Sequence, residues 1–149
     1  IYYFILSDRL MGGIIVTIIS LVADFSSVLT IPSPVNAFSA SGFDFASIDP
    51  MQTGKKSGVQ GLDFPNSGVR IRLPVTRDIV SLALQGAATE IRVQGLSAEN
   101  GPLVTAVVNP DHAIHHLSLK AAGIASVLID QGNNEGSLIS ISIDVEIAS

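Results

Sequence analysis

The densest group of potential ligand side chains in this sequence is the stretch DQGNNEG, residues 130–136. Asp130, Asn133, Asn134 and Glu135 offer oxygen atoms of the kind that Ca²⁺ prefers, although their spacing is not that of an EF-hand loop. Asn and Gly also adopt the left-handed backbone of tight turns, and Glu135 could accept hydrogen bonds from nearby amides. We therefore expect first a turn that leads into the next strand. A calcium site is the alternative, and calcium is the one cofactor that the residues suggest.

The three histidines, His112, His115 and His116, lie close together and raise the question of zinc binding or general-base chemistry. In a strand, His115 would share a face with Leu117, whereas His116 would point to the opposite side. The histidines therefore cannot converge on one ion from a straight strand. A metal site would need Asp111 or a distant ligand.

Other catalytic patterns are weak. The sequence contains no GxSxG nucleophile motif and neither of the glycine-rich phosphate-binding motifs, GxGxxG and GxxxxGK. Asp44 and Asp49 could serve as an acid–base pair, but capping of the loop at Asp49-Pro50 explains Asp49 more simply. We therefore expect that the protein is not an enzyme.

Composition limits the class of protein and of partner. The 149 residues are 47% hydrophobic and 14% charged, with 13 Gly and 7 Pro, which indicates one compact domain built from many short elements. The net charge of −5 and the lack of a basic cluster argue against nucleic-acid binding. There is no Cys, so disulfides and thiolate metal sites are excluded. The absence of Trp weakens a stacking platform for sugars without excluding one.

The elements that would position these side chains are strands. Apolar and polar residues alternate over residues 69–73, 80–85, 91–93 and 138–147, and further strands are expected at 103–108, 114–119 and 124–129. We expect residues 24–68 to form ordered loops or short edge strands. Strands spaced about ten residues apart, with turns between them, are typical of an antiparallel β-sandwich.

The N-terminal region contains an uncharged run, LMGGIIVTIISLVA, residues 10–23. The run follows Arg9, and a small-residue motif at 37–40 resembles a signal-peptide cleavage site, so a targeting segment is one interpretation. The run is too short to span a bilayer. Its β-branched residues favour a buried strand, so we predict an N-terminal β-hairpin over residues 2–22, with its second strand covered on both faces. A lipid-facing or partner-facing surface is the third interpretation.

Two motifs carry a family resemblance. The segment GLDFP at residues 61–65 and the pattern from Gly123-Ile124 to NEGSL at 134–138 resemble those of jelly-roll-type β-sandwich modules of bacterial extracellular and envelope proteins, which are similar to carbohydrate-binding modules. The resemblance extends over roughly residues 42–145. It implies a jelly-roll fold and an extracellular or cell-surface location, and it indicates a fold more than an activity.

Together these observations predict a single all-β domain over residues 1–149, with an apolar hairpin or leader at 1–23 and a sandwich at 24–149. We expect a non-catalytic structural subunit that forms homo-oligomers or polymers through edge strands or the hairpin, with no membrane span. The self-association residues would be Ile14, Ile15, Val16, Ile18 and Ile19. The alternative is a carbohydrate-binding module from a larger secreted protein, which calcium could stabilise. A small hydrolase is the weakest alternative.

Overall fold

The computed structural model describes residues 4–148, apart from the side chains of residues 4–7, 10, 11, 14 and 148, and this part of the chain is built from strands without helices. Every strand pairing is antiparallel, which confirms the predicted all-β class. Accordingly, no helix within residues 4–148 could cross a membrane. The strands are β1 (Phe4–Met11), β2 (Ile14–Asp24), β3 (Val35–Ala40), β4 (Phe43–Lys56), β5 (Val59–Asp63), β6 (Val69–Gln85), β7 (Ile91–Leu96), β8 (Pro102–Val108), β9 (Ile114–Gln131) and β10 (Ser137–Ala148).

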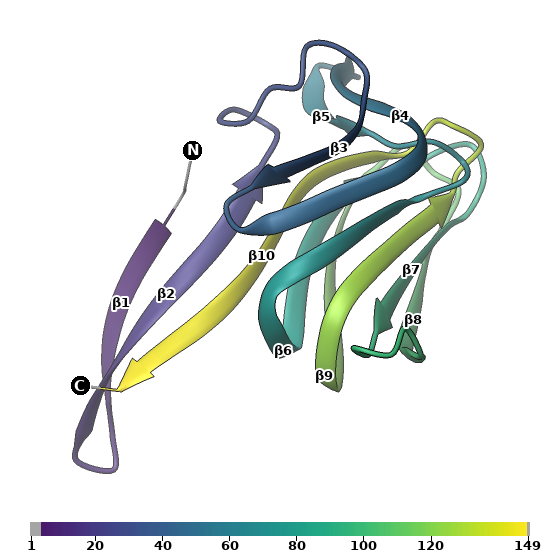
Figure 1. Cartoon of the computed structure of the whole chain (residues 1–149). Coiled ribbons are helices and arrows are strands. Elements are labelled where there is room, and N and C mark those ends of the chain that lie inside the picture. Colours follow the sequence, from purple (N-terminus) through teal and green to yellow (C-terminus); the bar gives the residue numbers. More distant parts are fainter. Residues whose placement is uncertain (1–3, 149) are drawn as a thin grey trace.

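The centre of the fold is a long ribbon formed by β6 and β9, bent in its middle (Figure 1). The first half of β6 also pairs with β4, whereas its second half pairs with β10. The bend coincides with register shifts between Arg72 and Ile79. Pro74 lies there and has no N–H for the ladder, and Gly123 on β9 has a φ of +79°. One ribbon therefore supplies strands to both sides of the core.

The two halves of β6 take part in a closed ring of four strands. Strand β10 pairs with β5, β5 with β4, β4 with β6, and β6 with β10. The described strands thus belong to one folded sheet, which runs β1-β2-β10-β5-β4-β6-β9-β7-β8, with β3 paired to β4. The jelly-roll topology of the predicted sandwich stays a prediction.

Aromatic residues serve the hydrophobic core. Phe25, Phe43, Phe45 and Phe64 are buried, and Phe38 packs against the core. The rings of Phe25 and Phe45 meet edge to face at 5.5 Å, while those of Phe38 and Phe45 stack at 4.6 Å. These five rings are therefore engaged in packing and do not form an exposed platform for stacking sugars.

Residues 24–68 are more regular than the sequence suggested. Strand β4 spans 14 residues. It pairs with β6 through its first half, with β5 through its second half, and with β3 between Phe43 and Met51. The alternation set by buried Phe43 and Phe45 breaks at Ile48, which is 85% exposed, and at Pro50. A change of pairing partners along one strand disrupts the two-residue period, and this is why the pattern hid the strand.

The N-terminal hairpin predicted over residues 2–22 forms in its described part, and residues 2 and 3 lie outside the described residues. Strands β1 and β2 pair with Met11 opposite Ile14, so that Gly12 and Gly13, with φ of +58° and +82°, form the two-residue turn. Strand β2 also pairs with β10 along Val16 to Asp24. Figure 1 shows β1, most of β2 and the end of β10 extending away from the other strands as an arm. We refer to this three-stranded extension as the arm.

Candidate functional site

The stretch at residues 130–136 is a tight turn between β9 and β10. Gln131, Gly132, Asn133 and Asn134 all have positive φ, between 52° and 82°. The Glu135 amide donates to the Gly132 carbonyl at 3.0 Å, and the Gly132 amide donates to the Glu90 carbonyl at 3.0 Å. Asn and Gly tolerate this left-handed backbone best, so the composition of the stretch follows from its shape.

The oxygen atoms of this turn point to different partners. Asp130 accepts two hydrogen bonds from Arg92, at 3.0 and 2.6 Å. Asn134 Oδ1 accepts from the Asn66 amide at 2.7 Å, and Glu135 Oε2 accepts from the Ala88 amide at 2.9 Å. The remaining member, Asn133, donates its amide to Asn66 Oδ1 at 3.0 Å. The four residues thus tie the turn to its neighbouring loops, and a calcium site there stays a prediction.

His115 and His116 lie on opposite faces of β9, whereas His112 is exposed in the loop before this strand. His115 Nε2 lies 2.6 Å from Asp111 Oδ1, and this hydrogen bond, together with the Ala113 amide, lowers the pKa of Asp111. His116 is exposed and lies beside Ser118 on the opposite face. Among the described residues, no three or more His, Asp or Glu side chains are grouped so that they could hold a metal ion.

A half-buried polar cluster lies on the ring of four strands. Burial raises the pKa of Asp63, although Lys56 Nζ is 3.7 Å from its Oδ1. A Cβ on Gly54 would come within 2.5 Å of Asp63 Oδ2, and a Cβ on Gly61 would clash with Ser137 Oγ. The two glycines therefore make room for these polar side chains. The sequence analysis missed this cluster; its only signal was a pair of glycines within otherwise strand-like segments.

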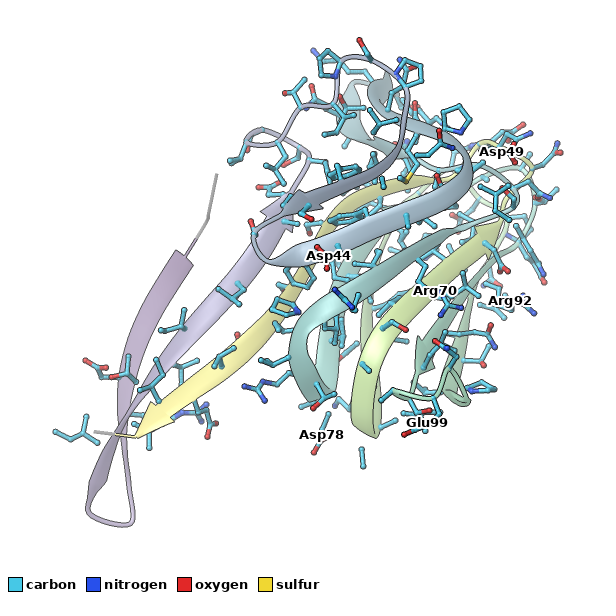
Figure 2. All side chains as sticks on the ribbon, in the orientation of Figure 1. Asp44, Asp49, Arg70, Asp78, Arg92 and Glu99 are labelled. Carbon is cyan, nitrogen blue, oxygen red and sulfur yellow. The ribbon has the colours of Figure 1, made fainter. Side chains whose placement is uncertain are left out.

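Arginines paired with polar or acidic side chains line the outer face of β4, β6, β9 and β7. Arg72 pairs with Asp44 at 2.8 Å, Arg92 pairs with Asp130, and Arg70 donates to Asn100. Figure 2 labels Asp44, Arg70 and Arg92 of this group. The Ser39 hydroxyl and Arg72 lower the pKa of Asp44. Because these arginines are paired with side chains of the same chain, a solvated structural face explains them.

A polar trough lies where the arm meets the bend of β6. Two adjoining hollows share Ser81 and Ser142. One continues past Ser118, Ser140 and His116, and the other ends among charged residues. There Arg77 donates to the Asp144 carbonyl at 2.9 Å, and the Ser20 hydroxyl donates to Asp144 Oδ1 at 2.5 Å. The charged lining residues are Arg9, Arg77, Asp78, Asp144 and Glu146.

The arm carries the residues predicted to mediate self-association. Val16 and Ile18 are each only 8% exposed, and Ile19 is half-buried, whereas Ile15 is 55% exposed. The side chain of Ile14 lies outside the described residues. The predicted second strand is thus covered along part of its length and open near the hairpin turn.

Comparisons with known proteins give little. No family model matches the chain, and no curated protein is similar to it. A solved structure, the glycoside hydrolase family 43 arabinoxylan arabinofuranohydrolase from Bacillus subtilis in complex with cellotetraose, is similar at a TM-score of 0.41 and 13% identity. The similarity covers 91% of this chain and 39% of the hydrolase chain. A likeness of this strength supports no inference about function.

Proposed function

We propose that this protein is a non-catalytic structural subunit of the cell surface or extracellular space, which self-associates through the arm. The observation that carries the proposal is an apolar face of β2 and β10 that begins in the core and continues onto the arm. On the core side, Ile141 and Ile143 of β10 are buried, and Leu21 of β2 packs against the same cluster. Further out, neighbouring residues of the same face become progressively exposed.

The strand register defines this face row by row. Ile143 is opposite Leu21, Val145 is opposite Ile19, and Ile147 is opposite Thr17. Val145 is half-buried and Ile147 is 49% exposed. Ile15 lies two residues beyond Thr17 on β2 and shares its face. Burying exposed apolar surface of this kind stabilises an assembly by about 25 cal/mol per Å².

A second copy of the arm is the partner that fits this face. The apolar side chains form one continuous stripe, so two such stripes can pack face to face about a two-fold axis. Asp8 is the charged residue of β1 that shares this face, and it accepts a hydrogen bond from Thr17 at 2.8 Å. A face with little unpaired charge favours association through apolar burial.

The test is a double substitution on the arm, Ile15→Ser with Ile147→Ser, measured by sedimentation velocity over a range of concentrations. We expect the variant to lose at least tenfold in association constant, because two exposed apolar side chains leave the interface. Ile48→Ser is the matched control, since Ile48 is a more exposed isoleucine on β4. Equal association of the arm variant and the control variant would disprove the arm as the interface.

The second candidate function is a carbohydrate-binding module of jelly-roll type, for which the polar trough is the observation. Its serine hydroxyls, with Arg77 and the carboxylates of Asp78 and Glu146, are groups that hydrogen-bond sugar hydroxyls. Glycan-array binding followed by calorimetry with Ser81→Val tests this function, with Ser27→Val, at an exposed turn position outside the trough, as the control. Loss of binding in Ser81→Val alone would support the trough, and an array without hits would refute this function.

Calcium binding is part of this second candidate function. A calcium ion held at residues 130–136 would raise the unfolding temperature, because it binds the folded state. The Asp130→Asn variant should abolish that rise. A temperature that is the same with calcium and with chelator in the wild-type protein would remove calcium from the proposal.

A further inference from the structure

Strand β8 forms the end of the sheet opposite to the arm. Within the described residues it pairs with β7 alone, so the other side of its backbone is unpaired. Leu103 is 42% exposed and Val107 is 52% exposed, with exposed Thr105 between them on the same face. An exposed apolar edge of this kind is a template for pairing with another strand.

The two ends of the sheet differ in how they are protected. Strand β1, the other end strand, carries Asp8 and Arg9 near its middle, and charged side chains discourage pairing between sheet edges. Strand β8 has the sequence PLVTAVV and contains no charge. Pro102 removes one N–H, but it stands at the first position of the strand, where it blocks the least. Strand β8 is therefore open to pairing over Leu103 to Val108.

We propose that β8 pairs antiparallel with β8 of a second copy, with the two Thr105 residues opposite each other on a two-fold axis. In this register Leu103 faces Val107 of the second copy, and Val104 faces Ala106 of the second copy. The two-fold axis repeats both pairs. Thr–Thr and aliphatic pairs between directly opposite residues are favourable in antiparallel sheets.

Strand β8 has no charged residue, so this register places no like charges opposite each other. Seven residues from each copy bury on the order of 1,000 Å² in total, which is at the low end for specific complexes. We therefore expect a weak dimer that depends on protein concentration. This inference rests on the proposed self-association, but it uses a surface separate from the arm.

Cysteine scanning tests the register directly, because the chain has no cysteine of its own. Directly opposite residues in an antiparallel pair have Cα atoms about 4.5–5.5 Å apart, within the range for a disulfide. Thr105→Cys should therefore form disulfide dimers under mild oxidation. Leu103→Cys alone should form at least tenfold fewer, since two copies of residue 103 would lie roughly four residues apart along the strands.

A mixture of Leu103→Cys and Val107→Cys supplies the positive control for the offset pair, and it should yield mixed dimers. Equal cross-linking of Thr105→Cys and Leu103→Cys would overturn the register. Thr105→Lys, which places two positive charges together, should abolish the β8 dimer, and mixing it with Thr105→Glu should restore the dimer. Failure of the mixture to restore it would overturn the proposal as well.

The arm and the β8 edge are distinguished by performing these measurements in the Ile15→Ser, Ile147→Ser background. Dimers in that background that depend on Thr105 would support β8 pairing whatever the fate of the arm proposal. If the Ile15→Ser, Ile147→Ser protein stays strictly monomeric at several hundred micromolar, β8 pairing is overturned. If Thr105→Lys still associates through the arm, the arm proposal survives the loss of β8 pairing.

Discussion

Asp63 is a half-buried carboxyl group on the closed ring, and its burial disfavours the charged form. Its carboxylate lies over Gly54 and near Lys56, yet burial raises its pKa above the ordinary value of 3.8. A raised carboxyl pKa means that folding favours the neutral acid. The stabilising contribution of this group is therefore present below pH 3.8 and is lost as the pH rises through the higher folded pKa.

Asp63→Asn should accordingly stabilise the protein at pH 7, by less than about 1 kcal/mol because the side chain is partly solvated. The difference should vanish near pH 3, where Asp63 is also neutral. Urea denaturation at pH 3, 5 and 7 measures both effects. Asp44→Asn is the control of opposite sign, since hydrogen bonds from Ser39 and Arg72 lower the pKa of Asp44, so it should destabilise at pH 7. Destabilisation by Asp63→Asn at pH 7 would contradict this account.

Gly136 is fixed by the aromatic ring beside it. A Cβ at this position would lie 2.6 and 2.9 Å from two ring carbons of Phe64, which is buried in the core. Gly136→Ala should lower the free energy of unfolding by roughly 1–3 kcal/mol, because the ring must shift within a packed core. Gly101→Ala is the control, as its nearest contact would be an ordinary 3.4 Å to Ser97 Oγ. Equal stability of the two variants in thermal unfolding would show that the core yields around Phe64.

The residue-level prediction that succeeded is the turn at residues 130–136, because backbone shape depends on local residue types such as Asn133 and Gly132. The polar cluster around Asp63 could not be predicted in the same way. Its members Lys56, Asp63 and Ser137 come from three strands, and only the register of β5 with β4 and β10 brings them together. The register of β5 with β4 follows from the two-residue turn at Ser57-Gly58, but no local pattern indicates that β10 pairs with β5.

Among the elements, the bend of the β6/β9 ribbon depends on Gly123. Its left-handed φ of +79° disfavours other residues, and its amide donates to Asp78 Oδ1 at 2.9 Å. Gly123→Ala should cost about 1 kcal/mol, and Gly123→Asn should cost less, because Asn tolerates this backbone better. Chemical denaturation measures both variants. No difference between Ala and Asn would argue that the backbone changes conformation on substitution.

The alternation of apolar and polar residues predicted the positions of most strands but not their lengths. The segments at 69–73 and 80–85 belong to one strand, β6, and those at 114–119 and 124–129 to another, β9. At the bend, exposed Val75 and Ile79 interrupt the alternation although the strand continues. The two-residue period records which face is buried, and it is lost where a strand passes from one side of the core to the other.

For the molecule as a whole, the proposed interfaces lie at opposite ends of the strand order. Two different two-fold interfaces on one subunit generate a closed dihedral assembly if the two axes intersect at a suitable angle, and an open chain of copies if they do not. Interfaces at opposite ends of the strand order favour the open chain. We expect the full chain to form linear polymers at high concentration. The arm variant and Thr105→Lys should each stop at dimers, and the combined variant should be monomeric. Sedimentation velocity with electron microscopy checks all four proteins, and polymers from the combined variant would refute this assembly.

The position of β10 has a consequence for how the chain folds. This last strand pairs with β2, β5 and β6, which precede it by long stretches of the sequence. During synthesis β2 and β5 can pair with β1 and β4, but they lack their second partner until residues 137–148 leave the ribosome. Loop closures of such length slow folding to the millisecond-to-second range. In that interval the arm's apolar strand is exposed to other nascent chains, so chaperone supply should influence the yield of folded protein more than the stability of the final sheet does.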